Sequence, residues 1–176
     1  MNITETLDSL KSLGTEQNRK IYKRHGVTGS AFGVSYANLG KLRKKIKTDH
    51  QLAQKLWTSS NHDARILAMM IADPGQTTDK ELDSWAKDLD NVVIAGAFSE
   101  FVSTTPLARK KMEKWTKARE EWIGTAGWSL MAFIAARDKE LSDDYFENYL
   151  AVIERDIHKS KNRVRYSMNG ALMGSG

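Results

Sequence analysis

The sequence contains no cysteine among its 176 residues, which excludes disulfides and thiolate metal sites. It also has no hydrophobic run long enough to cross a bilayer, and Met1 is followed by polar residues instead of a basic and then an apolar segment. Its longest nearly uncharged stretch, Ile123–Ala136, is too short and too interrupted by Gly, Thr and Ser to span a membrane. We therefore expect a cytoplasmic protein with no membrane contact.

Sequence signals for cofactors are also absent. The four histidines, His25, His50, His62 and His158, include no pair spaced i, i+4 on one helix, so we expect no metal site. The segment from Gly26 to Gly33 matches neither common nucleotide-binding pattern. We predict no cofactor.

The secondary-structure signals are almost entirely helical. Val and Ile are scattered without the alternation of a strand, whereas apolar residues recur at helical spacing. We expect helix N-caps at Thr15, Ser35 and Asn61, capping boxes beginning at Thr48 and Thr78, and a cap at Asp90. Nine or ten short helices follow, with residues 27–35 as the longest irregular connection. Two architectures suit them: a globular bundle, or helix pairs stacked as an α-solenoid.

The uncharged stretch Ile123–Ala136 is predicted to be a central buried helix, because a helix that is apolar nearly all round belongs inside a protein. Gly124 and Gly127 each cost roughly 1 kcal/mol relative to Ala within a helix. Close approach of a neighbouring helix or a ligand is the usual compensation. The five tryptophans also fall at core-type positions, with Trp128 as the candidate exception.

Charge is distributed in alternating blocks behind a net charge of +5. Residues 1–60 carry +7, residues 61–105 carry −5, residues 106–119 carry +5, residues 120–157 carry −6 and residues 158–176 carry +4. Stacked helices would bring like charges together and form a basic stripe suited to a polyanion. Simple solvated helix faces are the plainer interpretation. Asp79, Glu81 and Asp83 could form a carboxylate cluster, but acids in a first helical turn more often complement the macrodipole.

Two stretches resemble the bacterial DNA alkylation repair proteins. The first is LKSLGTEQNRKIYKRHGV together with FGVSYANLGKLRKKIKTDHQLAQKLWTSSNHDARILAMMIADP, and the second is IHKSKNRVRYSMNGAL. The resemblance implies an all-α fold of HEAT-like helical repeats stacked as a curved α-solenoid, a single domain over residues 1–176, and a positively charged DNA-binding face. Relatives of this type continue further, so we expect the chain to be truncated at its C-terminal end.

The founding members of that family are alkylpurine DNA glycosylases, and their catalytic pattern is not retained here. The family's Trp and the Asp four residues later align with Val92 and Gly96. The family's Arg aligns with Thr125, shortly after the retained Trp122, and a further aromatic aligns near Gly170. None of these replacements can stabilise a departing cationic base or position a water. The resemblance therefore implies the fold but no known catalytic residue.

Three hypotheses follow. The first is a monomeric, DNA-binding member of the family without the known glycosylase site. The second is an alkylpurine DNA glycosylase that uses other residues, with Trp128, Glu100 and Asp90 as candidates. The third is a protein-interaction scaffold. For the first, the expected DNA-binding residues are Lys23, Arg24, Lys41, Arg43, Lys44, Lys45, Arg163, Arg165 and Asn169. The expected cleft-lining residues are Trp122, Thr125 and Trp128.

Overall fold

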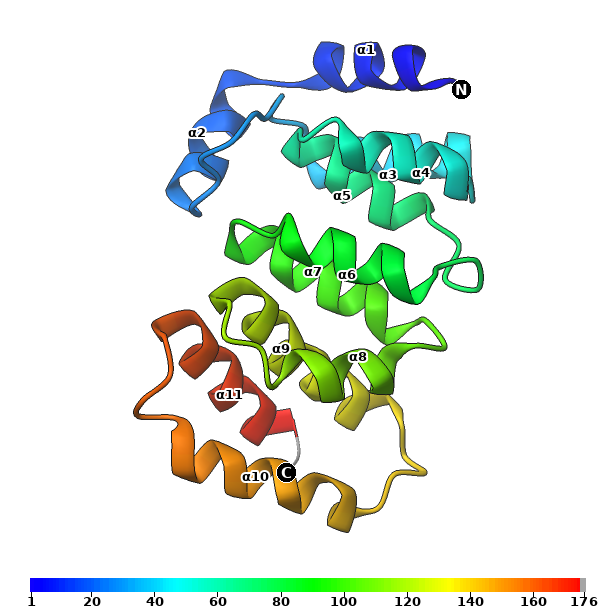
Figure 1. The fold of residues 1–176 in the computed structure, drawn as a ribbon. Coiled ribbons are helices and arrows are strands. Elements are labelled where there is room, and N and C mark those ends of the chain that lie inside the picture. The colour runs from blue at the N-terminus through cyan, green and yellow to red at the C-terminus, as the bar shows by residue number, and fades with distance from the viewer. Residues whose placement is uncertain (175–176) are drawn as a thin grey trace. The chain divides into compact units, whose positions relative to one another are not determined.

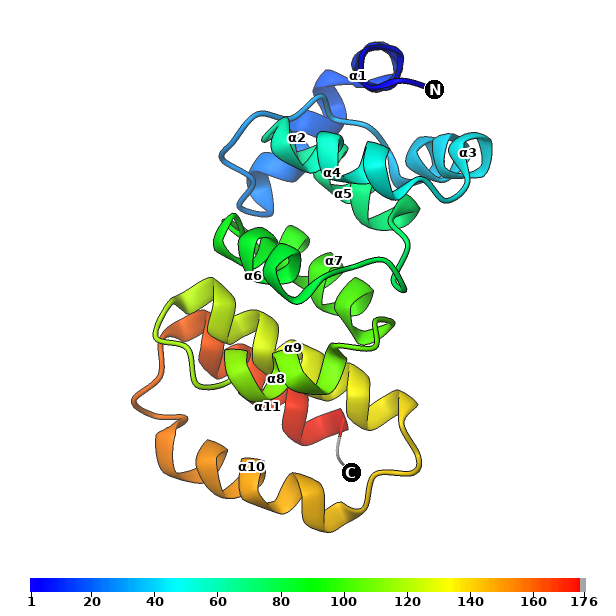
Figure 2. The same cartoon turned by 45° about the vertical axis from the view of Figure 1, so that its right-hand side comes forward.

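The computed structural model describes residues 1–174, and every regular element in that range is an α-helix (Figures 1 and 2). The predicted all-α class is confirmed, with eleven helices in the described range instead of nine or ten. The helices are α1 (Ile3–Leu13), α2 (Glu16–Arg24), α3 (Tyr36–Ile46), α4 (His50–Thr58), α5 (His62–Ile71), α6 (Asp79–Lys87), α7 (Val92–Ser103), α8 (Ala108–Trp115), α9 (Glu121–Arg137), α10 (Asp143–Asp156) and α11 (Asn162–Gly174).

Most helices begin where a side chain accepts a hydrogen bond from the first turn. The predicted caps Thr15, Ser35 and Asn61 each accept from the backbone N–H three residues later. Two predicted caps are wrong by one residue. Asp49 caps α4 in place of Thr48, and Asn91 accepts from the first turn of α7 in place of Asp90.

Contacts between residues divide the chain into two compact units. The first unit comprises Met1–Glu81 and Asp90–Ala97, and the second comprises Leu82–Leu89 and Phe98–Gly176. Helices α6 and α7 therefore contribute residues to both. The expected single domain over the whole chain stays a prediction.

In the first unit, α4 and α5 lie side by side in both views (Figures 1 and 2). Helix α5 is buried along nearly its whole length, because α3, α4 and α1 all contact it. Leu39 of α3, Leu56 of α4 and Leu67 of α5 are fully buried among these helices. Burial of each such side chain contributes roughly 1.5–3 kcal/mol, so this packing fixes the orientation of α3.

In the second unit, α9 is the buried central helix that the sequence predicts. It contacts both α8 and α11. A Cβ on Gly127 would lie 2.5 Å from the backbone of Trp115 and Thr116, so the glycine permits close approach of α8. At Gly124 the nearest atom is a methyl of Val164 in α11, 3.3 Å from an ideal Cβ. Helix packing therefore accounts for both glycines, as expected.

Candidate nucleic-acid interface

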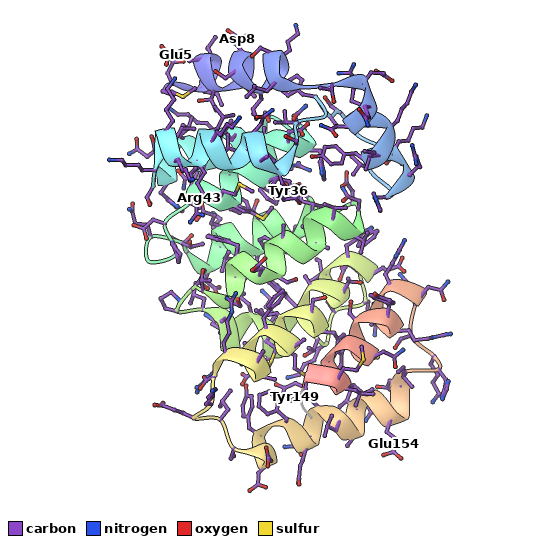
Figure 3. The ribbon with its side chains drawn as sticks, turned by 180° about the vertical axis from the view of Figure 1, so that it is seen from behind. Glu5, Asp8, Tyr36, Arg43, Tyr149 and Glu154 are labelled. Carbon is purple, nitrogen blue, oxygen red and sulfur yellow. The ribbon has the colours of Figure 1, made fainter. Side chains whose placement is uncertain are left out.

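The clearest basic surface of the first unit is on α3. Leu39 and Leu42 are buried, whereas Tyr36, Ala37 and the cations of the helix are exposed. Tyr36 and Arg43 are two turns apart on this helix and are labelled in Figure 3. Four cations of α3 are exposed: Lys41, Arg43, Lys44 and Lys45.

These four cations form no ion pair with any residue that the structure describes, and the same is true of Lys23 and Arg24 at the end of α2. All of them except Lys41 lie in the last turn of their helix, where a positive charge is favourable for the helix dipole. Because no internal carboxylate neutralises them, their charge is available to an external anion. Six of the nine predicted DNA-binding residues are thus exposed cations of α2 and α3.

An aromatic pocket of about 380 Å³ lies beside this basic surface. Tyr22 of α2 and Tyr36 of α3 line it, together with His25, Val93 and other residues of the same unit. Tyr36 is 50% exposed, which is unusual for so large a side chain. Sequence reasoning did not single out either tyrosine, although a tyrosine within each basic helix was a visible signal.

Tyr22 is held rigidly in the pocket wall. Its hydroxyl donates to the carbonyl of Val34, and its ring meets the edge of His62 at 5.1 Å between centroids. Burial raises the pKa of the Tyr22 phenol, and the charge of Asp63 and the nearby Tyr36 add to the increase. Burial also disfavours the charged form of His62 and so lowers its pKa, although the charges of Asp63 and Asp90 partly oppose this change. Both groups therefore stay neutral near pH 7, and Tyr22 keeps its proton to donate.

The loop between α2 and α3 is fixed by one buried carboxylate that the sequence analysis missed. Asp63, fully buried in the first turn of α5, accepts the backbone N–H groups of Phe32, Gly33 and Val34 at 2.6, 3.0 and 2.8 Å. Gly33 has φ +80°, and a Cβ there would lie 2.5 Å from the carbonyl oxygen of Thr15. The carboxylate thus sets the position at which α3 and its cations begin.

The basic helix α8 is organised differently, because its cations pair within the second unit. The carboxylate of Asp83 lies 2.8 Å from the Nζ of the buried Lys111 and 2.6 Å from the Nζ of the exposed Lys114. It also accepts a hydrogen bond from the indole N–H of Trp115 at 3.0 Å. Partial burial raises the pKa of Asp83, but these three hydrogen bonds together outweigh it and lower the pKa to about 2. Arg109 pairs with Asp138 at 2.5 Å. Asp83 is therefore a structural counter-ion.

On α11, the three predicted DNA-binding residues differ in their surroundings. Arg165 donates to the carbonyls of Ile157, His158 and Ser160, so its guanidinium closes the turn after α10. Arg163 and Asn169 are exposed. Arg165 is thus held by its own backbone partners, whereas Arg163 presents its charge to solvent.

The expected cleft-lining residues of α9 lie mostly in the core. Trp128 is 1% exposed and packs edge-on against Tyr149 of α10. Thr125 is 4% exposed and donates to the carbonyl of Glu121. Neither side chain can line an open cleft in this conformation, and only Trp122 is partly exposed. The apolar packing around the two glycines of α9 explains the difference.

The proposed substitute carboxylates are both on the surface. Asp90 accepts from the amide of Asn91, and Glu100 lies 3.5 Å from the guanidinium of Arg137. No cluster of metal-ligand side chains occurs within residues 1–174. In the same range, no helix is long and apolar enough to cross a membrane.

Both units consist of packed helices, and the first carries exposed cations on α2 and α3. These features are typical of a helical-repeat protein with a basic surface. Residues 6–175 match the family described as DNA alkylation repair enzyme, and the chain belongs to that family. Two uncharacterized proteins, Lin0241 of Listeria innocua and Lmo0209 of Listeria monocytogenes, are each 25% identical over 178 residues, covering 95% of this chain and 75% of each relative.

Similarity to a solved structure identifies the fold. It is described as a new family of proteins related to the HEAT-like repeat DNA glycosylases with affinity for branched DNA structures. The TM-score is 0.93 at 27% identity, over 99% of this chain and 75% of the other. The predicted HEAT-like repeat fold is therefore confirmed.

Proposed function

We propose that this chain binds DNA, mainly through its phosphate backbone, with branched structures as the preferred ligand. Six exposed cations on α2 and α3 without internal ion pairs are the observation that carries the proposal. Branched DNA is suggested by the related solved structure, whose family has affinity for it.

The aromatic pocket beside these cations supports the same ligand. Phosphate contacts position a protein on DNA, whereas exposed aromatic rings stack on bases that have left the duplex. Branch points present such unpaired bases more readily than a continuous duplex does. A partly exposed Tyr36 two helical turns from Arg43 places both kinds of contact on one helix.

The proposal is tested by replacing Lys41, Arg43, Lys44 and Lys45 with Gln and measuring affinity for a four-way junction across a salt series. Each lost phosphate contact lowers the slope of log K against log salt by about 0.9 for duplex DNA, so the four together lower it by up to about 3.5. Gln preserves helix propensity, so α3 stays folded.

A matched control removes the same charge from four other helices or turns. Lys11, Lys55, Lys87 and Lys139 are all exposed, and we expect their replacement with Gln to leave most of the slope intact. An unchanged slope in the α3 variant would show that DNA does not contact α3, and equal losses in the two quadruple variants would show that binding is not concentrated on α3.

A further inference from the structure

We propose that the turn between α3 and α4 contacts a phosphate of the bound DNA, with Lys47 as the binding residue. This role rests on the proposed DNA binding, and it adds a residue that lies beyond the helical surface of α3. The backbone conformation of Lys47 and the charges around it are the two observations that support this role.

Lys47 has a backbone conformation that is unfavourable for any residue with a side chain. It is the C-cap of α3, with φ +66° and ψ −136°, and its N–H donates to the carbonyl of Arg43 at 2.7 Å. This conformation is close to that of the first central residue of a type II′ turn, which is usually glycine because a Cβ crowds the neighbouring backbone there. Lys47 therefore carries backbone strain that a glycine would not carry.

Contacts on both sides of the turn hold this strained conformation in place. Before the turn, Leu42 is buried and fixes the end of α3 against the core. After the turn, the N–H of Asp49 donates to the carbonyl of Ile71 in α5 at 2.8 Å, and the carboxylate of Asp49 accepts the N–H of Leu52 at 2.9 Å. Residues 47–49 must connect these two fixed points, and a glycine at the first of them would do so without strain.

The side chain of Lys47 does not compensate for this strain within the protein. It is exposed, and it forms no hydrogen bond or ion pair with any residue that the structure describes. A positive charge at a helix C-terminus is favourable, but Arg43 and Lys44 lie four and three residues earlier, where like charges repel. The lysine is therefore a costly choice for the free protein on both counts.

The charge of the segment identifies the ligand of Lys47. Residues 36–48 contain no Asp or Glu, and Lys47 ends a run of five cations within seven residues: Lys41, Arg43, Lys44, Lys45 and Lys47. A polyanion removes the repulsion between such cations, because each phosphate contact neutralises one of them and releases condensed counterions. A cation at the strained end of this run is therefore suited to a phosphate of the DNA that α3 binds.

Three variants of the full chain separate the strain from the charge. Lys47→Gly removes both, Lys47→Gln removes the charge alone, and Lys47→Arg keeps both. We expect Lys47→Gly to raise the midpoint of thermal unfolding by about 2–6 °C, because the strain is relieved. The other two variants keep a side chain in the strained conformation, so their midpoints should stay within about 2 °C of the wild-type value.

Binding to a four-way junction and to a duplex across a salt series measures the phosphate contact. Lys47→Gly and Lys47→Gln should each lower the slope of log K against log salt by about 0.9, whereas Lys47→Arg should keep the wild-type slope. The glycine variant would then be more stable than the wild type but a weaker DNA binder. A lysine with a purely structural role would not give that combination.

The same unit offers a matched control for each property. Ser60, which follows α4, is exposed and also has a positive φ, +56°, but carries no charge. Lys55 is an exposed cation within the regular helix α4. We expect Ser60→Gly and Lys55→Gln to leave the salt slope of DNA binding unchanged.

The outcomes distinguish this role of Lys47 from the proposed function. A wild-type slope in both Lys47→Gly and Lys47→Gln, together with a lowered slope in the quadruple variant of α3, would overturn the role of Lys47 and leave DNA binding by α3 standing. An unchanged or lower unfolding midpoint for Lys47→Gly would overturn the strain on which the role depends. Absence of salt-dependent DNA binding by the wild type would overturn both proposals.

Discussion

At the scale of single residues, the buried carboxylate of Asp63 has the most specific set of partners. It accepts three backbone N–H groups from one loop, and it is fully buried. Asx residues in a first helical turn are common, so the sequence did not mark this one. Its partners lie 29–31 residues earlier in the chain, which no local pattern can reveal.

We predict that Asp63→Asn destabilises the protein by about 2–4 kcal/mol, because the amide has one acceptor oxygen and turns an N–H₂ group toward backbone donors. Urea denaturation measures the loss. The exposed Asp8→Asn of α1 is the matched control, with a change within about 0.5 kcal/mol. A similar stability for the two variants would mean that the loop does not depend on Asp63.

At the scale of helices, local signals predicted much of the fold. A cap acts on an N–H three residues away, so Thr15, Ser35 and Asn61 could be identified from sequence. The errors at Thr48 and Asp90 occurred where the next residue, Asp49 or Asn91, is an equally good cap. Propensity alone cannot choose between two adjacent capping residues.

Long-range pairing limited the prediction of the basic surface. The cations of α8 and those of α3 look alike in sequence, but Asp83 binds Lys111 and Lys114 from 28 and 31 residues away. Similarly, Arg165 is held by carbonyls that only the turn after α10 brings near. Which cations remain available therefore depends on tertiary structure.

The approach of α8 to α9 gives the second prediction. Gly127→Ala should destabilise the second unit by about 1–3 kcal/mol despite the better helix propensity of Ala, since the new Cβ meets backbone atoms at 2.5 Å. Gly170→Ala in α11 is the control. Its Cβ meets nothing within 4 Å, so the propensity gain of up to about 1 kcal/mol should appear. Thermal unfolding of both variants should shift in opposite directions, and a shared direction would contradict the packing argument.

The contact between α6 and α8 should make stability depend on pH. The pKa of Asp83 is about 2 in the folded protein, below the ordinary value of 3.8. Its stabilising contribution is therefore complete above about pH 4 and is lost as the pH falls toward 2. Because the carboxylate is partly exposed, we expect this contribution to be roughly 1–2 kcal/mol.

Urea denaturation at a series of pH values between 5 and 2 measures this effect. Asp83→Asn should flatten that part of the profile. It should also destabilise the protein at pH 7 by about 3–5 kcal/mol, because it removes the counter-charge of the buried Lys111. An unchanged acid limb in the variant would assign the pH dependence to other carboxylates.

At the scale of the whole chain, membership of a repair family does not settle whether this protein excises bases. The resemblance in sequence predicts that Val92, Gly96, Thr125 and a position near Gly170 stand where the glycosylases carry functional side chains. Gly96 has no side chain, and an ideal Cβ there meets nothing within 4 Å. Thr125 is buried with its hydroxyl bonded to Glu121. No side chain at these positions supplies a cation, a carboxylate or a stacking ring.

We therefore predict no measurable release of 7-methylguanine or 3-methyladenine from DNA by this chain. A glycosylase must stabilise positive charge on the departing nucleoside and position a water, and loss of one such contact typically lowers the rate about 10²–10³-fold. Loss of several that act together leaves little above the spontaneous reaction. Single-turnover assays with excess protein measure the release. Asp90 and Glu100 are the candidate replacement carboxylates, so release above background that Asp90→Ala or Glu100→Ala abolishes would establish a different catalytic site. DNA binding by the same preparation, measured on a four-way junction, shows that an inactive sample is still folded and able to reach its ligand.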